Sequence, residues 1–141
     1  MNDNFKTWKT VEVGDCASKT QTITSDMVDQ FAKLTGDDNP IHLDEQYAKK
    51  TVFRKRVVHG VFQISLISAL LATEMPGRGS IYHSQNTLFT AALFVGESVT
   101  ARVEVIERLE ATKQIRLKTT CMNDQNQLTM DGTAIVYPAR R

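Results

Sequence analysis

The residues best suited to chemistry lie in the segment 37–42, which reads Asp-Asp-Asn-Pro-Ile-His. Pro40 fixes its own φ and keeps Asn39 extended, so this segment is stiff and cannot continue a preceding helix. In such a turn Asp37 and His42 can converge on one small volume. A carboxylate beside an imidazole can exchange protons with a substrate near neutral pH, and the Asn39 amide can orient a carboxylate or a water. The competing interpretation is a helix cap followed by an Asx turn, which composition alone would favour.

A second segment, 57–65, could supply the electrostatic half of an active site. Gly60 stands where an apolar helix begins, and a helix start leaves backbone N–H groups unpaired. A glycine lets a ligand approach that backbone closely, which suits an anion or a developing oxyanion. We interpret His59 as a scaffold or capping residue rather than a base. Ser68, two helical turns beyond Gly60, either contacts a substrate or donates back to the Ile64 carbonyl.

Several other chemistries are disfavoured. The three histidines (His42, His59 and His83) show no ligand spacing, so we expect no metal site. Cys16 and Cys121 are far apart and match no redox or metal motif, which predicts reduced thiols in the cytoplasm. No Gly-x-Ser-x-Gly elbow occurs, which argues against a serine hydrolase.

Length and charge narrow the class of protein. A chain of 141 residues with 41% hydrophobic residues and a net charge of +1 predicts one globular domain over 1–141. The densest basic run, 54–56, is either a solvated turn or a site of anion attraction, and we expect no nucleic-acid partner. The N-terminal residues lack signal-peptide order. The longest apolar stretch, 60–73, contains a glutamine and is shorter than the ~18 residues that span a bilayer. We therefore expect a cytoplasmic protein with no membrane partner.

Helical periodicity identifies the elements that flank these segments. The pattern predicts a helix over 25–36, with Ser25 as N-cap and Gly36 ending it. Its apolar face is expected to comprise Met27, Val28, Phe31 and Leu34. A short helix is predicted over 43–50, and a long one from residue 60 to about residue 75 is apolar almost all round, which indicates burial. Its polar residues Gln63, Ser65 and Ser68 need partners if they are buried.

Strand patterns surround the long helix in the sequence. We expect strands within 11–24, 80–90, 98–110, 114–124 and 127–138. The clearest alternation places four apolar residues on one face, namely Val99, Ala101, Val103 and Val105. The segment 123–127 suits a hairpin turn. The order predicts an α+β domain in which antiparallel strands wrap around one buried helix.

Together, the two segments resemble a known family. The pattern Asp-x-Asn-Pro-x-His at 37–42 and the His-Gly helix start at 59–60 are similar to the MaoC-like (R)-specific enoyl-CoA hydratases. The likeness runs from about Val13 to Pro138, including the Gly-Glu turn at 96–97, and is strongest to the short hydratases that supply polyhydroxyalkanoate synthesis. One departure is Arg56, where relatives often have proline.

The resemblance implies a hot-dog fold and a homodimer with active-site tunnels at the subunit interface. It implies catalytic roles for Asp37, His42 and the backbone N–H of Gly60. Substrate contacts are expected at Asn39, Ser68 and His59, with Ser68 near the acyl pocket.

The implied activity is a lyase reaction, the reversible hydration of trans-2-enoyl-CoA to (R)-3-hydroxyacyl-CoA, with no cofactor beyond the coenzyme A of the substrate. Either Asp37 or His42 could be the base. The alternatives are a hot-dog acyl-CoA thioesterase, which the Asp37–His42 pair disfavours, and a non-catalytic acyl-thioester binding module.

Overall fold

The computed structural model describes residues 5–140, which form a five-stranded antiparallel sheet and four helices. The strands lie in the order β1-β3-β4-β5-β2, so β1 and β2 are the two edges. The predicted α+β class is confirmed. The elements in chain order are β1 (Cys16–Thr22), α1 (Ser25–Thr35), α2 (Pro40–Leu43), α3 (Glu45–Ala48), α4 (Gly60–Thr73), β2 (Ile81–Leu88), β3 (Ser98–Leu109), β4 (Gln114–Asn123) and β5 (Leu128–Tyr137).

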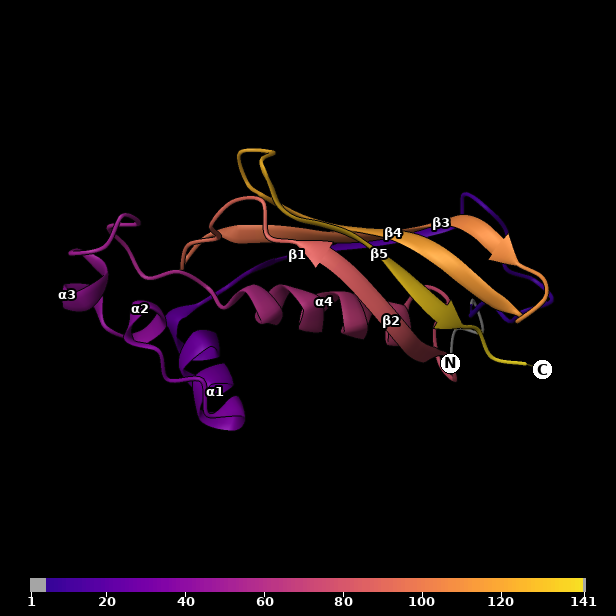
Figure 1. Ribbon diagram of the computed structural model, residues 1–141, viewed down its shortest axis with the longest axis horizontal. Helices are drawn as coiled ribbons and strands as arrows, with labels where there is room; N and C mark the ends of the chain where they lie inside the picture. Colours follow the sequence, from indigo (N-terminus) through magenta and orange to yellow (C-terminus); the bar gives the residue numbers. More distant parts are fainter. Residues whose placement is uncertain (1–4, 141) are drawn as a thin grey trace.

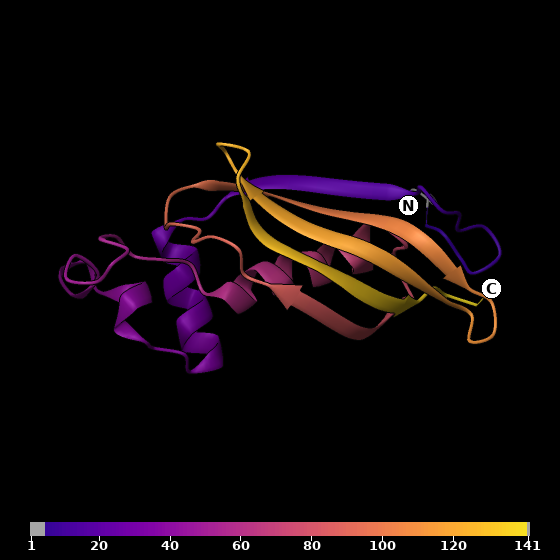
Figure 2. The ribbon, with the colours of Figure 1, turned by 45° about the horizontal axis from the view of Figure 1, so that its top comes forward.

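Helix α4 lies along one face of the sheet, and the three shorter helices gather beyond the end of the sheet where α4 begins (Figure 1, Figure 2). The segment 37–42 is thereby carried to the N-terminus of α4. The fold brings the two segments singled out in the sequence together at one end of the sheet.

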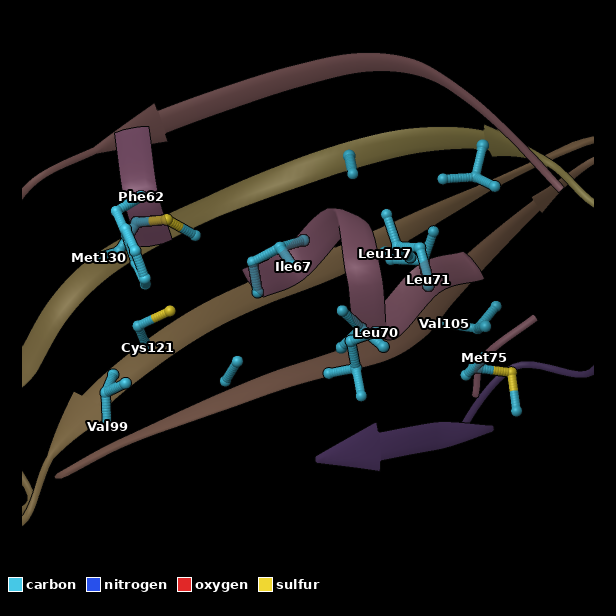
Figure 3. Packing of buried hydrophobic residues seen from close by; sticks show 14 of the residues in the cluster. Phe62, Ile67, Leu70, Leu71, Met75, Val99, Val105, Leu117, Cys121 and Met130 are labelled. Atoms are coloured by element: carbon cyan, nitrogen blue, oxygen red, sulfur yellow. The ribbon is translucent and has the colours of Figure 1, made fainter. Parts of the chain in front are cut away.

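The core fills the space between α4 and the sheet (Figure 3). Ile67, Leu70 and Leu71 of α4 pack against buried side chains of the strands, among them Val105 and Leu117. The predicted alternation in β3 is confirmed, since Val99, Ala101, Val103 and Val105 are all buried. Each fully buried aliphatic side chain of this kind contributes roughly 1.5–3 kcal/mol, so the scaffold holds the helix start in a fixed place.

The start of α1 differs from the sequence prediction by one residue. Thr24, not Ser25, is the N-cap: its hydroxyl accepts from the Met27 N–H at 3.2 Å, and the Met27 sulfur accepts from the Thr24 N–H. Ser25 is the first helical residue, and its hydroxyl accepts a hydrogen bond from the Arg56 side chain. Gly36 ends the helix in the left-handed region at φ 81°, as predicted.

The apolar face of α1 is also narrower than predicted. Val28 and Ala32 are buried and Phe31 is half-buried, but Leu34 is 86% exposed. The helix lies beyond the end of the sheet and points away from it, so the sheet does not cover its last turn (Figure 1).

The prediction that α4 is buried all round is wrong for one of its faces. The sheet covers a single side of the helix, which leaves Val61 50% exposed and leaves Ser65, Ala69 and Ala72 open as well. Beyond this face, Ile81 of the edge strand β2 is exposed too. None of the helices within residues 5–140 has both the length and the apolar character to cross a membrane.

Candidate active site

The structure brings Asp37 and His42 together, as their spacing predicts. One ligand atom from each of Asp37, His42 and His59 lies within 4.8 Å of the others. His42 Nδ1 donates to the Val57 carbonyl at 2.7 Å. Because a carbonyl only accepts, Nδ1 carries the hydrogen, and Nε2 of the neutral ring is left free to accept or deliver a proton.

The segment 37–42 is a helix start rather than an irregular turn. Pro40 is the first residue of α2, where its missing N–H is no loss. The Asn39 side chain accepts from the Ile41 N–H at 3.3 Å and so caps this turn. His42 therefore sits on one rigid helical turn, with Asp37 just outside its cap. Asp38 is exposed.

Burial and nearby titratable or charged groups shift the pKa of the His42 imidazole. Burial is the main influence and lowers its pKa, while the hydrogen bond to the Val57 carbonyl raises it. The neighbouring His59 and Arg56 lower the pKa further, and Asp37 raises it. The net result is a pKa below the usual 6.5, so His42 is neutral at physiological pH.

His59 lies behind His42 and supports it. The two rings stack with centroids 3.8 Å apart, and His59 Nε2 donates to the Asp37 backbone carbonyl at 3.0 Å. Its side chain is 1% exposed and does not line the cavity described below. The expected substrate contact is therefore corrected to a scaffold role, in which its ring fixes both catalytic candidates. It makes no side-chain cap to α4, and its Nδ1 meets no hydrogen-bond partner within residues 5–140.

A cavity of about 460 Å³ opens beside His42 at the start of α4. Its lining is mostly apolar, with Phe89 and Leu93 on the segment after β2, and Asn39 and Gly60 border it. The Gly60 N–H points out of the first turn of a 14-residue helix and donates to no acceptor within residues 5–140. The helix dipole adds partial positive charge there, which favours an oxyanion. Asp37 is 45% exposed and lies next to His42 but does not itself line the cavity.

Ser68 is placed differently from the other candidates. It is half-buried on α4 and does not line the cavity. The alternative of a bond back to the Ile64 carbonyl is not realised in the described chain, although Ser65 makes such a bond to Val61 at 3.2 Å. The neighbouring positions Ser65 and Ala69 lie on the uncovered face of α4, so the single chain brings no element of its own onto this surface.

The sequence reasoning missed the role of Gln63. This buried side chain lines the cavity one turn beyond Gly60, and its carboxamide lies 2.6 Å from the Thr129 hydroxyl. A glutamine in an otherwise apolar helix was the available signal, but its partner is 66 residues away in the sequence. Gln63 gives the cavity a polar group beside the oxyanion position.

Two of the three histidines, His42 and His59, form a cluster with Asp37, contrary to the expectation from their spacing. However, one nitrogen of each ring already donates to a carbonyl oxygen, from His42 to Val57 and from His59 to Asp37. Of the other groups, His59 Nδ1 makes no hydrogen bond within residues 5–140, and the Asp37 carboxylate lies 4.0 Å from His59 Nε2.

The chain is similar to known proteins in both sequence and structure. Residues 10–129 match the MaoC like domain. The chain is 40% identical over 126 residues to a 3-hydroxybutyryl-CoA dehydratase of Methylorubrum extorquens, covering 89% of this chain and 80% of the relative. It is 38% identical over 128 residues to an (R)-specific enoyl-CoA hydratase of Aeromonas caviae, covering 91% and 96%.

The solved structure of the A. caviae (R)-hydratase involved in PHA biosynthesis superposes with a TM-score of 0.90 at 38% identity, covering 92% of this chain and 98% of that one. The fold is therefore the hot-dog fold expected from the sequence. The match of sequence, fold and domain over most of the chain shows that this protein belongs to the MaoC-like dehydratase family.

Proposed function

We propose that this chain is an enoyl-CoA hydratase, a lyase that adds water reversibly to trans-2-enoyl-CoA and forms (R)-3-hydroxyacyl-CoA. The observation that carries the proposal is that His42, clustered with Asp37, lines the same apolar cavity of about 460 Å³ as Gly60, whose N–H has no acceptor within residues 5–140. The activities named for the Methylorubrum and Aeromonas relatives support it.

In the proposed mechanism the thioester oxygen accepts a hydrogen bond from the Gly60 N–H. Negative charge grows on that oxygen as water attacks the β-carbon, so the helix start stabilises the transition state more than the bound substrate. Asp37 and His42 hold the water; one removes its proton, and the pair returns a proton to the α-carbon. His42 takes part through Nε2, since Nδ1 donates to Val57. No cofactor enters the cycle.

We further propose that the protein is a homodimer of the cytoplasm. The uncovered face of α4 (Val61, Ser65, Ala69 and Ala72) and the free edge of β2 support a second copy as partner, because unpaired strand edges and apolar patches favour association. The free thiols Cys16 and Cys121 are consistent with a reducing compartment. Sedimentation of the wild type and a Val61→Glu variant tests the dimer: a wild-type monomer at micromolar concentration would refute it.

The activity is tested by following the loss of enoyl absorbance when the protein meets crotonyl-CoA. Asp37→Asn and His42→Gln should each lower kcat by at least about 10²-fold, in line with the contribution of a general acid or base. Asp38→Asn is the matched control, since this exposed neighbour carries the same charge and should keep wild-type turnover. Wild-type protein that leaves enoyl-CoA of several chain lengths intact would refute the proposal, and release of free thiol would identify a thioesterase instead.

A further inference from the structure

Arg56 makes three directed contacts on the connector before α4. Its Nε donates to the His42 carbonyl at 2.6 Å, Nη1 to the Ser25 hydroxyl at 2.7 Å, and Nη2 to the Asp29 carboxylate at 2.9 Å. The side chain is only 10% exposed. A planar guanidinium can satisfy three acceptors in fixed directions, whereas an ammonium group cannot reproduce this geometry.

These contacts tie α1 to α2 through the residue that carries the imidazole. Ser25 and Asp29 lie on α1, and the His42 carbonyl lies at the end of α2. The next residue of the connector, Val57, accepts from His42 Nδ1 at 2.7 Å. Two consecutive residues thus fix His42 by hydrogen bonds: Arg56 donates to its backbone carbonyl, and the Val57 carbonyl accepts from its ring.

The neighbours of Arg56 show that this is not a property of the basic run as a whole. Arg54 and Lys55 are exposed, and neither forms an ion pair within residues 5–140. Arg54 donates to the Lys49 carbonyl at 3.3 Å and Lys55 lies over the Phe94 ring, so the run 54–56 contains two exposed cations with local contacts and one largely buried guanidinium that joins separate elements. Neither interpretation of the run made from the sequence, a solvated turn or a site of anion attraction, anticipated this role.

We propose that Arg56 is a positioning residue for His42, which fixes the imidazole relative to the Gly60 N–H. The inference rests on the proposed hydratase function. Because the guanidinium acts through the His42 backbone, its loss should impair the chemical step more than substrate binding. The titratable or charged groups that influence His42 are Arg56, His59 and Asp37, and Arg56 disfavours the protonated imidazole.

The test compares Arg56→Met and Arg56→Lys with wild type in steady-state hydration of crotonyl-CoA. We expect Arg56→Met to lose about 10- to 100-fold in kcat, since small misplacements of reacting groups have costs of that order, with KM changed less than about threefold. Arg56→Lys should recover part of the rate. The His42 pKa, followed by NMR of the ring, should rise in Arg56→Met, and the corresponding limb of the pH–rate profile should move to higher pH whether His42 acts as acid or base.

Arg108 provides a matched control away from the site. Its Nη1 also donates to backbone carbonyls, to Trp8 at 3.0 Å and to Val11 at 2.6 Å, and its Nε pairs with the Glu110 carboxylate. Arg108→Met should lower the Tm but leave kcat and the His42 titration unchanged. A purely structural role for Arg56 would make the two variants behave alike.

Two results would overturn the proposal: Arg56→Met with kcat within about twofold of wild type, or with an unshifted His42 titration. If Arg56→Met fails to fold, Arg56→Lys decides in its place, since equal kcat and an equal pH profile would refute the positioning role. Wild-type protein that does not hydrate enoyl-CoA would instead refute the proposed function, and the NMR titration would still test the contact between Arg56 and His42.

Discussion

Replacement of Gly60 by alanine tests the oxyanion position with little disturbance of the fold. A Cβ at this position would lie 3.0 Å from Cε2 and Cζ of the Phe89 ring and 3.1 Å from Cδ2, a few tenths of an ångström closer than carbon atoms normally approach. Phe89 is about half exposed, so its ring can turn away. Alanine also gains at most about 0.5–1 kcal/mol over glycine in a helix. We therefore expect the free energy of unfolding to change by less than about 1 kcal/mol.

The effect of Gly60→Ala on activity should be much larger. The new methyl group and the displaced ring both narrow the approach to the Gly60 N–H, which borders the cavity. Loss of one oxyanion-hole donor costs about 10²–10³ in kcat, or about 2.7–4 kcal/mol. Because the N–H itself remains, we expect a loss near the lower end, about 10²-fold in kcat/KM.

Urea unfolding and crotonyl-CoA hydration, measured on the same preparation, separate these two effects. The double variant Gly60→Ala/Phe89→Leu removes the ring that the methyl would meet, and any recovery of rate measures how much of the loss comes from that contact. Gly60→Ala with kcat/KM within about threefold of wild type would refute the oxyanion assignment. A loss of activity that merely parallels a loss of stability would refute it as well.

Three further predictions concern titration, metals and thiols. The folded-state pKa of His42 lies below its unfolded value near 6.5, so the unfolded chain binds more protons and the free energy of unfolding should fall as the pH drops below about 6.5. The urea midpoint should therefore fall between pH about 7.5 and pH about 5, and it should fall less in His42→Gln than in wild type; an equal fall in both would contradict the buried imidazole. Dialysis against EDTA should leave hydration unchanged, whereas a loss restored by Zn²⁺ would show that Asp37, His42 and His59 hold a metal. Ellman's reagent near pH 8 should titrate one thiol in the folded protein and two in urea, because Cys16 is exposed and burial raises the pKa of Cys121 to about 12; two fast thiols in the folded protein would show that the core opens.

The sequence alone determined the five strands, the helices α1 and α4 and the segment that carries the candidate residues, whereas α2 was not predicted and the helix expected over 43–50 is shorter, at Glu45–Ala48. Alternation in β3 and the continuous apolar run of α4 are both local patterns, so the α+β class and the helix start at Gly60 followed from short stretches of sequence. Pro40 and Asn39 likewise fixed a local turn that brings Asp37 near His42.

Only the tertiary structure decided how these residues are supported. Arg56 meets Asp29 across 27 positions and Gln63 meets Thr129 across 66, and no local period reports such pairs. The burial of His59 beneath His42 depends on the packing of several elements, so its scaffold role could not be separated from a substrate contact in the sequence. The sequence shows that a residue is apolar but not which element packs against it. The exposed face of α4 is therefore a feature of the tertiary structure, in which the sheet covers a single side of the helix.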